Sequence, residues 1–360
     1  MSDQRPYKKI GLIGGGQLGR MLGMAAARLG HKTIVLDPAK DCPAAQVCNE
    51  HIVAAYDDQQ AFAGLHDCDV VTFEFENIGV AAIRALSGIV DVAPGPLALE
   101  MTQDRLTEKQ FLADTGLPTA AYHAIDTAIQ LETALKEFGG RGILKTRRFG
   151  YDGKGQVLFA GKIDDPSPQQ ALDQISNAPA ILEAWVPFAL EISVIVTRNA
   201  SGQSVCFDPA QNLHKGGILH RSTVPAEISA QTRSDALERA IKLVEALNYV
   251  GTLGLEFFVL PDGSLLANEF APRVHNSGHW TEAACTINQF EMHIRAITGW
   301  PLPTPVRHSD AMMENLIGDD VWNLKRLALD GQLLLHDYGK TDIRAGRKMG
   351  HFSKIMPKTA

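Results

Sequence analysis

Short apolar segments alternate with amphipathic helical segments along the first hundred residues, and this alternation restricts the fold more than any other feature of the sequence. Strands joined through helices pair in parallel. We therefore predict an α/β domain with a parallel, mononucleotide-binding type of sheet over residues 1–100. The expected strands are 9–13, 32–36, 70–73 and 89–93, and the expected helices begin near residues 17 and 80.

Two further segments follow this domain. A larger one covers residues 101–300 and contains a lid-sized subdomain at about 120–190. The proline-rich stretch WPLPTP marks its boundary near residue 301, and residues 301–360 are expected to form a small C-terminal α/β appendix. Hydrophobic periodicity predicts single helices at 100–115, 234–247 and 281–298.

Charge and cysteine content exclude several classes of protein. The net charge is −7 with no long Lys/Arg run, which argues against a nucleic acid or an anionic membrane as the partner. The 5 cysteines form no C-x-x-C motif, which favours a reduced, cytoplasmic setting over a disulfide framework. The first residues lack the apolar stretch of a signal peptide, and no segment approaches the ~18 apolar residues of a membrane span. We expect a cytoplasmic, multidomain enzyme.

Two glutamates flank a turn signal in LEFFVLPDGSLLANEF. A two-residue turn at Asp262–Gly263 would place Glu256 directly opposite Glu269, with Cβ atoms about 4.5–5.5 Å apart. Facing carboxylates on an apolar face repel each other unless a cation lies between them. A hard divalent cation such as Mg²⁺, sharing its other ligands with phosphate oxygens, would remove this conflict. The alternative is a half-exposed pair neutralised by nearby Lys or Arg side chains.

A G-x-G-x-x-G motif formed by Gly14, Gly16 and Gly19 directly follows the first expected strand. Asp37 ends the next strand, which completes the outline of a dinucleotide fingerprint. The motif by itself indicates less than dinucleotide binding. Its glycines allow close approach of the backbone to a ligand, and the helix N-terminus attracts a phosphate. A single phosphomonoester would fit as well as a pyrophosphate, and a turn that needs glycine only for packing is the remaining alternative.

A second glycine-rich segment follows a lysine inside an apolar strand. Lys145 lies in GILKT, where its charge requires an anionic partner. The next residues, RRFGYDGKG, combine glycines with cations and suit a mobile flap over a polyphosphate. The segment is not a Walker A loop, and the alternative is a basic surface hairpin.

Further charged residues cluster in PRVHNSGHW and RAGRKMG. His275 and His279 have the spacing of an H-x-x-x-H metal motif, but the neighbouring Pro272 and Gly278 disfavour a helix. A loop that presents Arg and His to an oxyanion is the preferred interpretation. Composition alone favours an ordinary solvated charge run at 344–348.

Taken in order, the motifs resemble those of the N5-carboxyaminoimidazole ribonucleotide synthetases, a family of ATP-grasp enzymes of purine synthesis. The resemblance rests on GGGQLGRM, TFEFEN, DRLTEKQ, GYDGKGQ, NLHKGGIL, GLEFF, NEFAPRVHNSGHWT and RAGRKMGH. Several ATP-grasp families share the paired glutamates, whereas APRVHNSGHWT and GRKMGH are far more specific to this one. The resemblance implies an ATP-grasp domain preceded by a pre-ATP-grasp, Rossmann-like domain, and a homodimer.

The resemblance also implies residue roles for the nucleotide and its metal. Glu183 and Val186 would bind adenine and Glu191 the ribose hydroxyls, while Mg²⁺, with Mn²⁺ as a possible substitute, would be held by Glu256 and Glu269. The full set implied for ATP binding is Arg105, Lys145, Gly150, Tyr151, Asp152, Gly153, Lys154, Gly155, Gln156, Glu183, Ala184, Trp185, Val186, Glu191, His214, Asn268 and Glu269.

A second set would bind the ribonucleotide substrate and the carbon donor. Arg273, His275 and Lys348 would be the catalytic residues that hold bicarbonate and then carboxyphosphate. The residues implied for aminoimidazole ribonucleotide are Gln17, Leu18, Glu76, Tyr151, Asp152, Asn276, Ser277, Arg347 and Lys348, with its phosphate near the first two. The resemblance thus assigns the first glycine loop to a sugar phosphate instead of NAD.

The implied activity is that of an ATP-dependent carboxylating ligase. It would transfer bicarbonate, through carboxyphosphate, to the exocyclic amine of 5-aminoimidazole ribonucleotide and give N5-carboxyaminoimidazole ribonucleotide in de novo purine biosynthesis. One alternative is another ATP-grasp ligase, such as a formate-dependent glycinamide ribonucleotide transformylase or a biotin carboxylase. The others are an NAD-dependent dehydrogenase built on the first glycine loop and a non-catalytic nucleotide sensor.

Overall fold

A computed structural model of the chain describes residues 7–150 and 155–359, and its first sheet is parallel with the order β3-β2-β1-β4. The strand expected at 89–93 is wrong: Val92 makes only an isolated bridge to Val71, and Pro94 lacks the N–H that would continue a ladder. The other three expected strands are confirmed to the residue. The strands are β1 (Lys9–Ile13), β2 (Lys32–Leu36), β3 (Glu50–Ile52) and β4 (Val70–Phe73).

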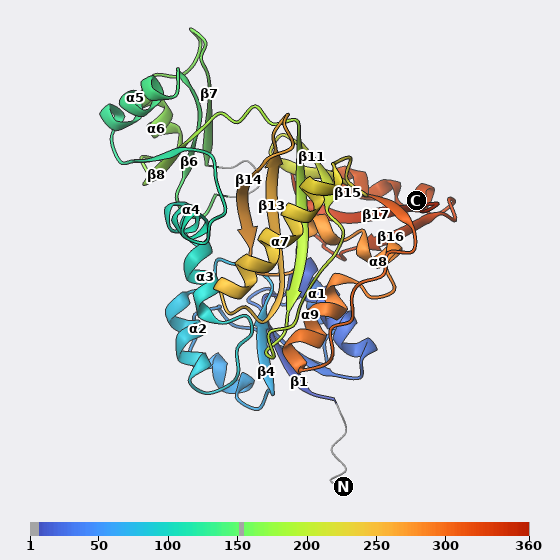
Figure 1. Ribbon diagram of the computed structural model, residues 1–360. Helices are drawn as coiled ribbons and strands as arrows, with labels where there is room; N and C mark the ends of the chain where they lie inside the picture. The colour runs from blue at the N-terminus through green and yellow to red at the C-terminus, as the bar shows by residue number, and fades with distance from the viewer. Residues whose placement is uncertain (1–6, 151–154, 360) are drawn as a thin grey trace.

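Helices cover both faces of this sheet (Figure 1). On one face, α1 (Gln17–Arg28) packs its apolar side against the sheet and against α9 (Gln289–Thr298), which belongs to a distant part of the chain. On the other face lies α2 (Val80–Ser87). Because α9 also packs on the central sheet, the N-terminal domain is joined to the central one through a shared core.

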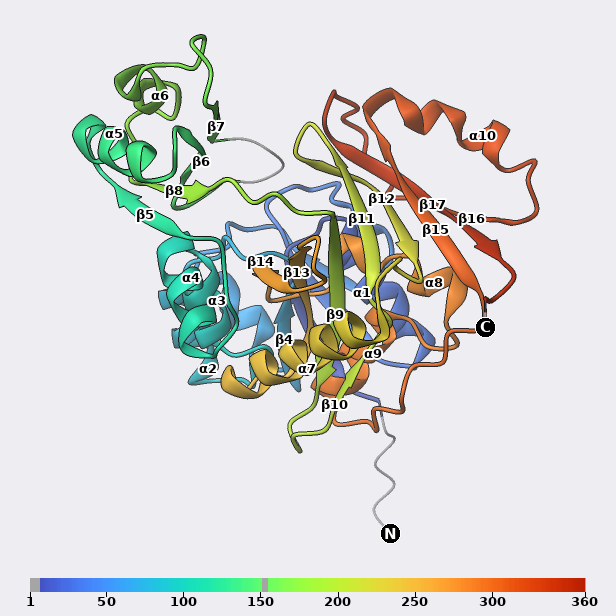
Figure 2. The same cartoon turned by 45° about the horizontal axis from the view of Figure 1, so that its top comes forward.

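The central sheet has 9 strands, which pair antiparallel in the order β14-β13-β9-β11-β12-β15-β17-β16, with β10 also paired to β9. Helix α7 (Ala230–Ala246) covers β9 and β13 through alanine and leucine side chains. The C-terminal strands extend this sheet instead of building a separate one (Figure 2). The strands are β9 (Leu190–Arg198), β10 (Ser204–Cys206), β11 (Ala210–Lys215), β12 (Ile218–Val224), β13 (Gly251–Val259), β14 (Leu265–Ala271), β15 (Asp310–Ile317), β16 (Leu333–Asp337) and β17 (Lys348–Met356).

A third, 4-stranded sheet of order β5-β8-β6-β7 forms the lid, which projects from one corner of the molecule (Figures 1 and 2). It is packed on one face by α5 and α6, whose apolar side chains form a core of their own with the sheet. The elements are β5 (Tyr122–Ile125), α5 (Ala128–Glu137), β6 (Arg141–Thr146), β7 (Gln156–Ala160), α6 (Pro168–Gln174) and β8 (Ala180–Ala184).

Two helices expected to be continuous are each broken by a capping residue. The expected 100–115 helix is α3 (Pro96–Thr102) and α4 (Arg105–Asp114), because Asp104 accepts a hydrogen bond from Leu106 N and starts a new helix. The expected 281–298 helix is α8 (Thr281–Ala284) and α9, where Asn288 caps Glu291 N. The remaining helix is α10 (Leu324–Leu327), with 3-10 turns at Pro43–Gln46, Ala61–Leu65, Asn276–Gly278 and Gly318–Asn323. Within the described residues, no helix has the length and apolar character needed to cross a membrane.

The register of the β13–β14 hairpin differs from the expected one. Leu260 N donates to Ser264 O at 2.9 Å, so the turn is one residue longer than the expected two-residue turn, and it contains Gly263 at φ +86°. A β-bulge further along then restores the register, and it places Glu256 opposite the consecutive pair Asn268–Glu269. The predicted direct pairing of the two glutamates is therefore wrong in detail.

Removal of the cap at Asn288 tests the break between α8 and α9. Asn288→Ala should lower the free energy of unfolding by about 1 kcal/mol, because the N–H of Glu291 at the start of α9 loses its hydrogen-bond acceptor. Urea unfolding followed by circular dichroism measures this difference. Asn323→Ala is the matched control, since Asn323 precedes α10 without a side-chain capping bond. Equal stabilities of the two variants would contradict the capping role.

Candidate active site

The bulge in β14 gathers three oxygen-bearing side chains on one cavity wall: Glu256, Asn268 and Glu269. Without the irregularity, Asn268 and Glu269 would point to opposite faces of the strand. Burial and the nearby charge of Glu269 raise the pKa of Glu256 to about 7. The carboxylate of Glu269 is instead paired with the Arg105 guanidinium at 3.0 Å. Asn268 Oδ1 is buried and has no hydrogen-bond partner, so a third oxygen is available for a cation.

Helix α4 holds the backbone of this bulge through two residues that we did not single out from the sequence. Glu108 accepts a hydrogen bond from Phe270 N at 2.7 Å, and Lys109 Nζ donates to Asn268 O at 3.0 Å. Both side chains are buried, with Lys109 only 1% exposed. Their spacing from Arg105 is i+3 and i+4, which puts all three on one helix face. That spacing within DRLTEKQ was the signal available in the sequence.

Lys145 has its anionic partner inside the protein. Glu183 Oε2 lies 3.1 Å from Lys145 Nζ and 3.3 Å from Lys109 Nζ. Burial raises the pKa of Glu183, but the two ammonium groups outweigh it and hold that pKa at about 2. Two lysines share one carboxylate, which leaves a net positive charge beside the cavity that Lys145 lines. The lysines contact only Oε2, whereas Glu183 Oε1 is buried without a hydrogen-bond partner among the described residues, and the contact of Glu183 with adenine stays a prediction.

The loop after β14 points its basic residues at the same cavity. Arg273 Nε donates to Glu76 Oε2 at 2.7 Å, and Arg273 Nη2 to Glu76 Oε1 at 3.3 Å, in a two-pronged pair. Burial raises the pKa of Glu76, but Arg273 outweighs it and keeps the carboxyl ionised. The pair connects the loop to the segment that follows β4 of the parallel sheet.

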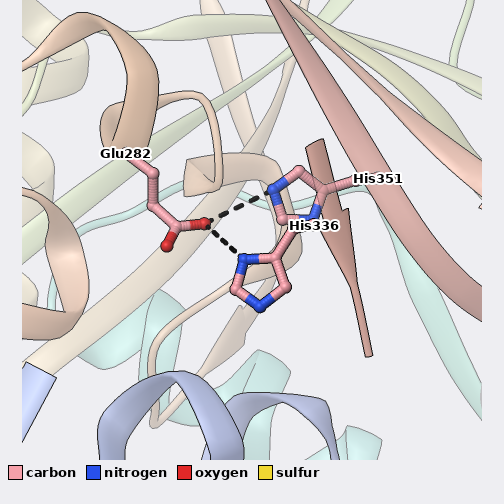
Figure 3. A group of neighbouring side chains, drawn as sticks. All are labelled: Glu282, His336 and His351. Atoms are coloured by element: carbon pink, nitrogen blue, oxygen red, sulfur yellow. Dashed lines mark ion pairs between the residues drawn. The ribbon is translucent and has the colours of Figure 1, made fainter. Parts of the chain in front are cut away.

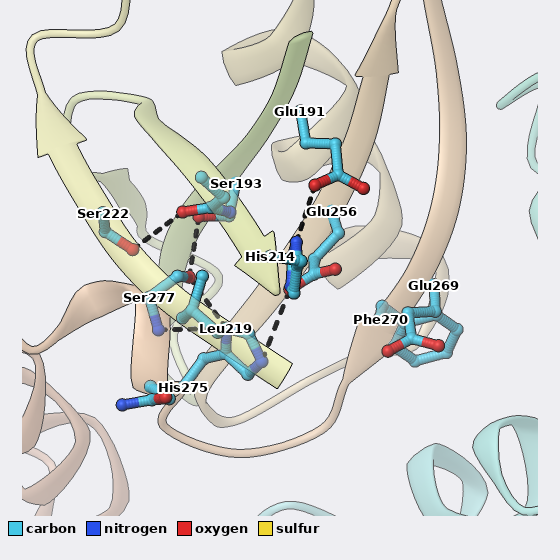
Figure 4. A network of polar contacts seen from close by, with 12 residues as sticks. Glu191, Ser193, His214, Leu219, Ser222, Glu256, Glu269, Phe270, His275 and Ser277 are labelled. Atoms are coloured by element: carbon cyan, nitrogen blue, oxygen red, sulfur yellow. Dashed lines mark hydrogen bonds and ion pairs between the residues drawn. The ribbon is translucent and has the colours of Figure 1, made fainter. Parts of the chain in front are cut away.

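His275, on the same loop, faces the carboxylate of Glu256 (Figure 4). Burial, followed by the charges of Arg273 and Lys348, lowers the pKa of His275 to about 3, so the imidazole is neutral. Ser277 Oγ lies 2.8 Å from Nδ1 and itself accepts from Ser193 Oγ, which makes Ser277 a donor to Nδ1. The ring proton therefore resides on Nε2, which lies 3.7 Å from Glu256 Oε1. Ser277 is fully buried and orients His275, whereas the resemblance implied a substrate contact.

A carboxylate–imidazole pair, Glu191 and His214, lies beside Glu256 (Figure 4). Glu191 Oε2 lies 2.6 Å from His214 Nδ1. Burial lowers the pKa of His214, but the hydrogen bond to Glu191 outweighs it and raises that pKa above its ordinary value. The pair brings together β9 and β11, and both residues line the cavity.

Two adjoining cavities of about 340 and 510 Å³ contain most of the site, both in the range of small-molecule pockets. They meet at a common wall, called here the junction, formed by Glu76, Asn77, Arg273, His275 and Lys348. The first cavity, between lid and central sheet, is lined among others by Arg105, Lys145, Gly150, Gly155, Gln156, Glu191, His214, Glu256, Asn268 and Glu269. The second is lined among others by Gln17, Leu18, Asn276, Lys340, Arg344 and Arg347.

The remaining expected site residues lie elsewhere. Ala184, Trp185 and Val186 follow the buried Glu183 at the start of the connection from β8 to β9, and none of these four is among the described residues that line either cavity. Tyr151, Asp152, Gly153 and Lys154 fall outside the described residues.

Internal carboxylates occupy the first glycine loop, which changes its expected chemistry. Glu74 accepts hydrogen bonds from Gly16 N and Gly19 N, and Asp37 accepts from Gly15 N at 2.7 Å. Asp37 also accepts from Tyr56 Oη at 2.6 Å. The loop N–H groups and the acid of the dinucleotide fingerprint are thus used within the protein, which argues against NAD. Gln17 and Leu18, which the resemblance assigned to the phosphate of the ribonucleotide substrate, line the second cavity.

Comparison with known proteins matches the chain along nearly its whole length. A ribonucleotide synthetase pre-ATP-grasp domain matches residues 7–103, an ATP-grasp domain residues 110–290, and a phosphoribosylaminoimidazole carboxylase C-terminal domain residues 311–360. The N5-carboxyaminoimidazole ribonucleotide synthase of Brucella melitensis is 57% identical, with 99% of this chain and 98% of the relative covered. That of Bacillus subtilis is 42% identical, with 97% and 91% covered.

Solved structures agree with these matches. Carboxyaminoimidazole ribonucleotide synthase from Aspergillus clavatus complexed with ATP superposes with a TM-score of 0.92 at 31% identity, covering 98% of this chain and 94% of that one. The complex of the Aspergillus clavatus enzyme with ADP and 5-aminoimidazole ribonucleotide has a TM-score of 0.90 at 30% identity and the same coverage. The chain belongs to the N5-carboxyaminoimidazole ribonucleotide synthases, a family of ATP-grasp ligases.

Proposed function

We propose that this chain uses ATP and bicarbonate to carboxylate the exocyclic amine of 5-aminoimidazole ribonucleotide, giving N5-carboxyaminoimidazole ribonucleotide. The observation that carries the proposal is the junction between the two cavities. A nucleotide in the first cavity and a sugar phosphate in the second would meet there, beside Arg273, His275 and Lys348. An intermediate formed from one ligand would then lie next to the amine of the other.

Glu256, Asn268 and Glu269 suit Mg²⁺, or Mn²⁺ in its place. Hard divalent cations prefer carboxylate and amide oxygens, and the orphaned Asn268 Oδ1 supplies one without any loss of an existing bond. Glu256 would ligate in its ionised form, and Glu269 would turn from Arg105 toward the metal. Bound Mg²⁺ would neutralise charge on the phosphate oxygens of ATP.

Bicarbonate oxygen attacks the γ-phosphorus of ATP, the bond from that phosphorus to the β,γ-bridging oxygen breaks, and carboxyphosphate and ADP form. Lys145 and Arg105 line the first cavity and would stabilise the negative charge that spreads over the phosphoryl group. Carboxyphosphate then releases phosphate and CO₂, and the amine nitrogen bonds to the carbon of CO₂. The amine gives up one proton, for which the released phosphate is the candidate acceptor.

His275 and Arg273 would hold the carbon donor without competing for its proton. A neutral imidazole with its proton on Nε2 donates one hydrogen bond into the cavity and stays neutral near pH 7. Arg273 supplies fixed positive charge, and its pair with Glu76 limits the orientations of the guanidinium. Carboxyphosphate hydrolyses readily, so the lid has to close over the first cavity before this intermediate forms.

Two further properties belong to the same proposal. We expect the enzyme to act in the cytoplasm, where purine synthesis supplies its substrates. We also expect a homodimer, as the family resemblance implies, and light scattering of the purified protein tests this.

Release of ADP tests the proposed reaction. With ATP and Mg²⁺ present, ADP should form only slowly unless bicarbonate and 5-aminoimidazole ribonucleotide are both added. Glycinamide ribonucleotide with formate should not replace them, and turnover with that pair would decide for a transformylase. Glu269→Gln should lower turnover at least about a hundredfold, because a charged ligand near the phosphates is lost. Glu132→Gln, on the exposed face of α5, is the matched control.

Metal affinity should depend on pH through Glu256. Protons compete with the metal for the carboxylate of Glu256, whose pKa is about 7. The affinity for the metal should therefore be constant above pH 7 and should fall by up to about tenfold per pH unit below it. Electron paramagnetic resonance of free Mn²⁺ measures this in the presence of a non-hydrolysable ATP analogue. Glu256→Gln should bind more weakly at every pH and lose the dependence. A flat wild-type profile down to about pH 5 would refute the assignment.

Lys109 should act as a positioning residue for the nucleotide side of the site. Lys109→Met removes the bond to Asn268 O and one of the two cations around Glu183, so we expect a rise in KM for ATP and a fall in kcat of about tenfold or more. The KM for aminoimidazole ribonucleotide should change little, and Lys109→Arg should recover part of the loss. Lys162→Met, at an exposed lid position, serves as the control. A uniform loss for both substrates would indicate a purely structural role.

A further inference from the structure

A second cluster of potential metal ligands lies away from the ATP site, where the central domain meets the C-terminal strands. Figure 3 shows Glu282 from α8 facing His336 from β16 and His351 from β17. Glu282 Oε2 lies 3.4 Å from His336 Nδ1 and 3.4 Å from His351 Nε2. The three ligand atoms all lie within 4.8 Å of one another.

Hydrogen bonding among these groups does not explain their arrangement. Within the described residues, Glu282 Oε2 and His351 Nε2 are buried atoms without a hydrogen-bond partner. A charge-assisted hydrogen bond between such groups would be about 2.7–2.9 Å long, so 3.4 Å is too long for a good one. Two ligands of a tetrahedral ion with bonds of about 2.0–2.1 Å are separated by about 3.3–3.4 Å, which is the distance from Glu282 Oε2 to each imidazole nitrogen.

The surroundings keep the ligands in the forms that bind metals. Tyr338 Oη lies 2.9 Å from His351 Nδ1 and is fully buried, so the nitrogen opposite to the cluster is already engaged. Burial lowers the pKa of His351, which favours the neutral imidazole.

We propose that Glu282, His336 and His351 bind a divalent transition metal of the Zn²⁺ class, with water in the fourth position. Two imidazoles and one carboxylate form a donor set typical of Zn²⁺, whereas Mg²⁺ prefers oxygen alone. His279, earlier considered with His275 as a metal motif, is not part of this group of ligand atoms, although its Nε2 is buried without a hydrogen-bond partner among the described residues. Its Nδ1 accepts from Gln289 Nε2, and its ring packs against that of His351.

The expected role of this metal is to fasten α8 to β16 and β17. Lys348, at the junction of the two cavities, begins β17, and the loop that contains Arg273 and His275 leads into α8. A metal bound by Glu282 and His351 would therefore fix two walls of the active site relative to each other. This role does not depend on which reaction the site catalyses.

Metal analysis of untagged protein tests the proposal. Protein stripped with a chelator and dialysed against Zn²⁺ should retain stoichiometric zinc by mass spectrometry and gain thermal stability. Glu282→Gln and His336→Gln should each weaken Zn²⁺ binding at least about tenfold, and Tyr338→Phe by a smaller factor in the same direction. Co²⁺-loaded wild type should give the visible absorption of a four- or five-coordinate ion, and Glu282→Gln should not.

Two controls separate this site from other metal sites. His66→Ala, at an exposed histidine outside the cluster, should bind Zn²⁺ as wild type does. Glu256→Gln should also retain the zinc, since its defect lies in the ATP site. Zinc retained equally by Glu282→Gln and His336→Gln, or no stoichiometric zinc in wild type, would overturn the proposal and leave the cluster as a buried ion-pair network.

Discussion

The shared ion pair of Glu183 with Lys109 and Lys145 ties together the parts of this molecule that form the nucleotide side of the site. Lys109 belongs to α4, Lys145 and Glu183 to neighbouring strands of the lid, and the same Lys109 reaches the bulge of β14 through Asn268 O. A buried charge that loses its partner is strongly destabilising, so a rearrangement that separated Glu183 from both lysines would carry a large energetic cost. The position of Glu269 therefore depends on a lysine that touches no metal.

Electrostatics also separate the roles of neighbouring groups. Burial keeps His275 neutral, while Arg273, buried beside Glu76, stays charged because its partner is ionised. The same cavity thus offers a neutral donor and a fixed cation within one loop. This combination suits a site that has to hold bicarbonate and a phosphorylated intermediate without taking their protons.

Two kinds of error in the sequence-based expectations have different causes. The periodicity of apolar residues continues across Asp104 and Asn288, so it predicted unbroken helices, although both capping residues are visible in the sequence. The glycine loop was expected to bind a phosphate through its N–H groups. Glu74, which accepts two of those bonds, follows the end of β4 and is distant from the loop in the sequence, and no local pattern indicates that it lies against the N-terminus of α1.

Local pattern was sufficient for β1, β2 and β4, because short apolar strands are properties of neighbouring residues. The candidate site residues came from the family resemblance; many of them line the two cavities, whereas residues 183–186 do not. Other features are visible only in the tertiary structure. They are the longer turn at Gly263, the bulge that points Asn268 and Glu269 into the same cavity, and the contacts of Glu108 and Lys109 with the backbone of that bulge. The physical reason is that periodicity encodes which side chains are buried, whereas the partner of a buried charge is supplied by an element far away in the chain.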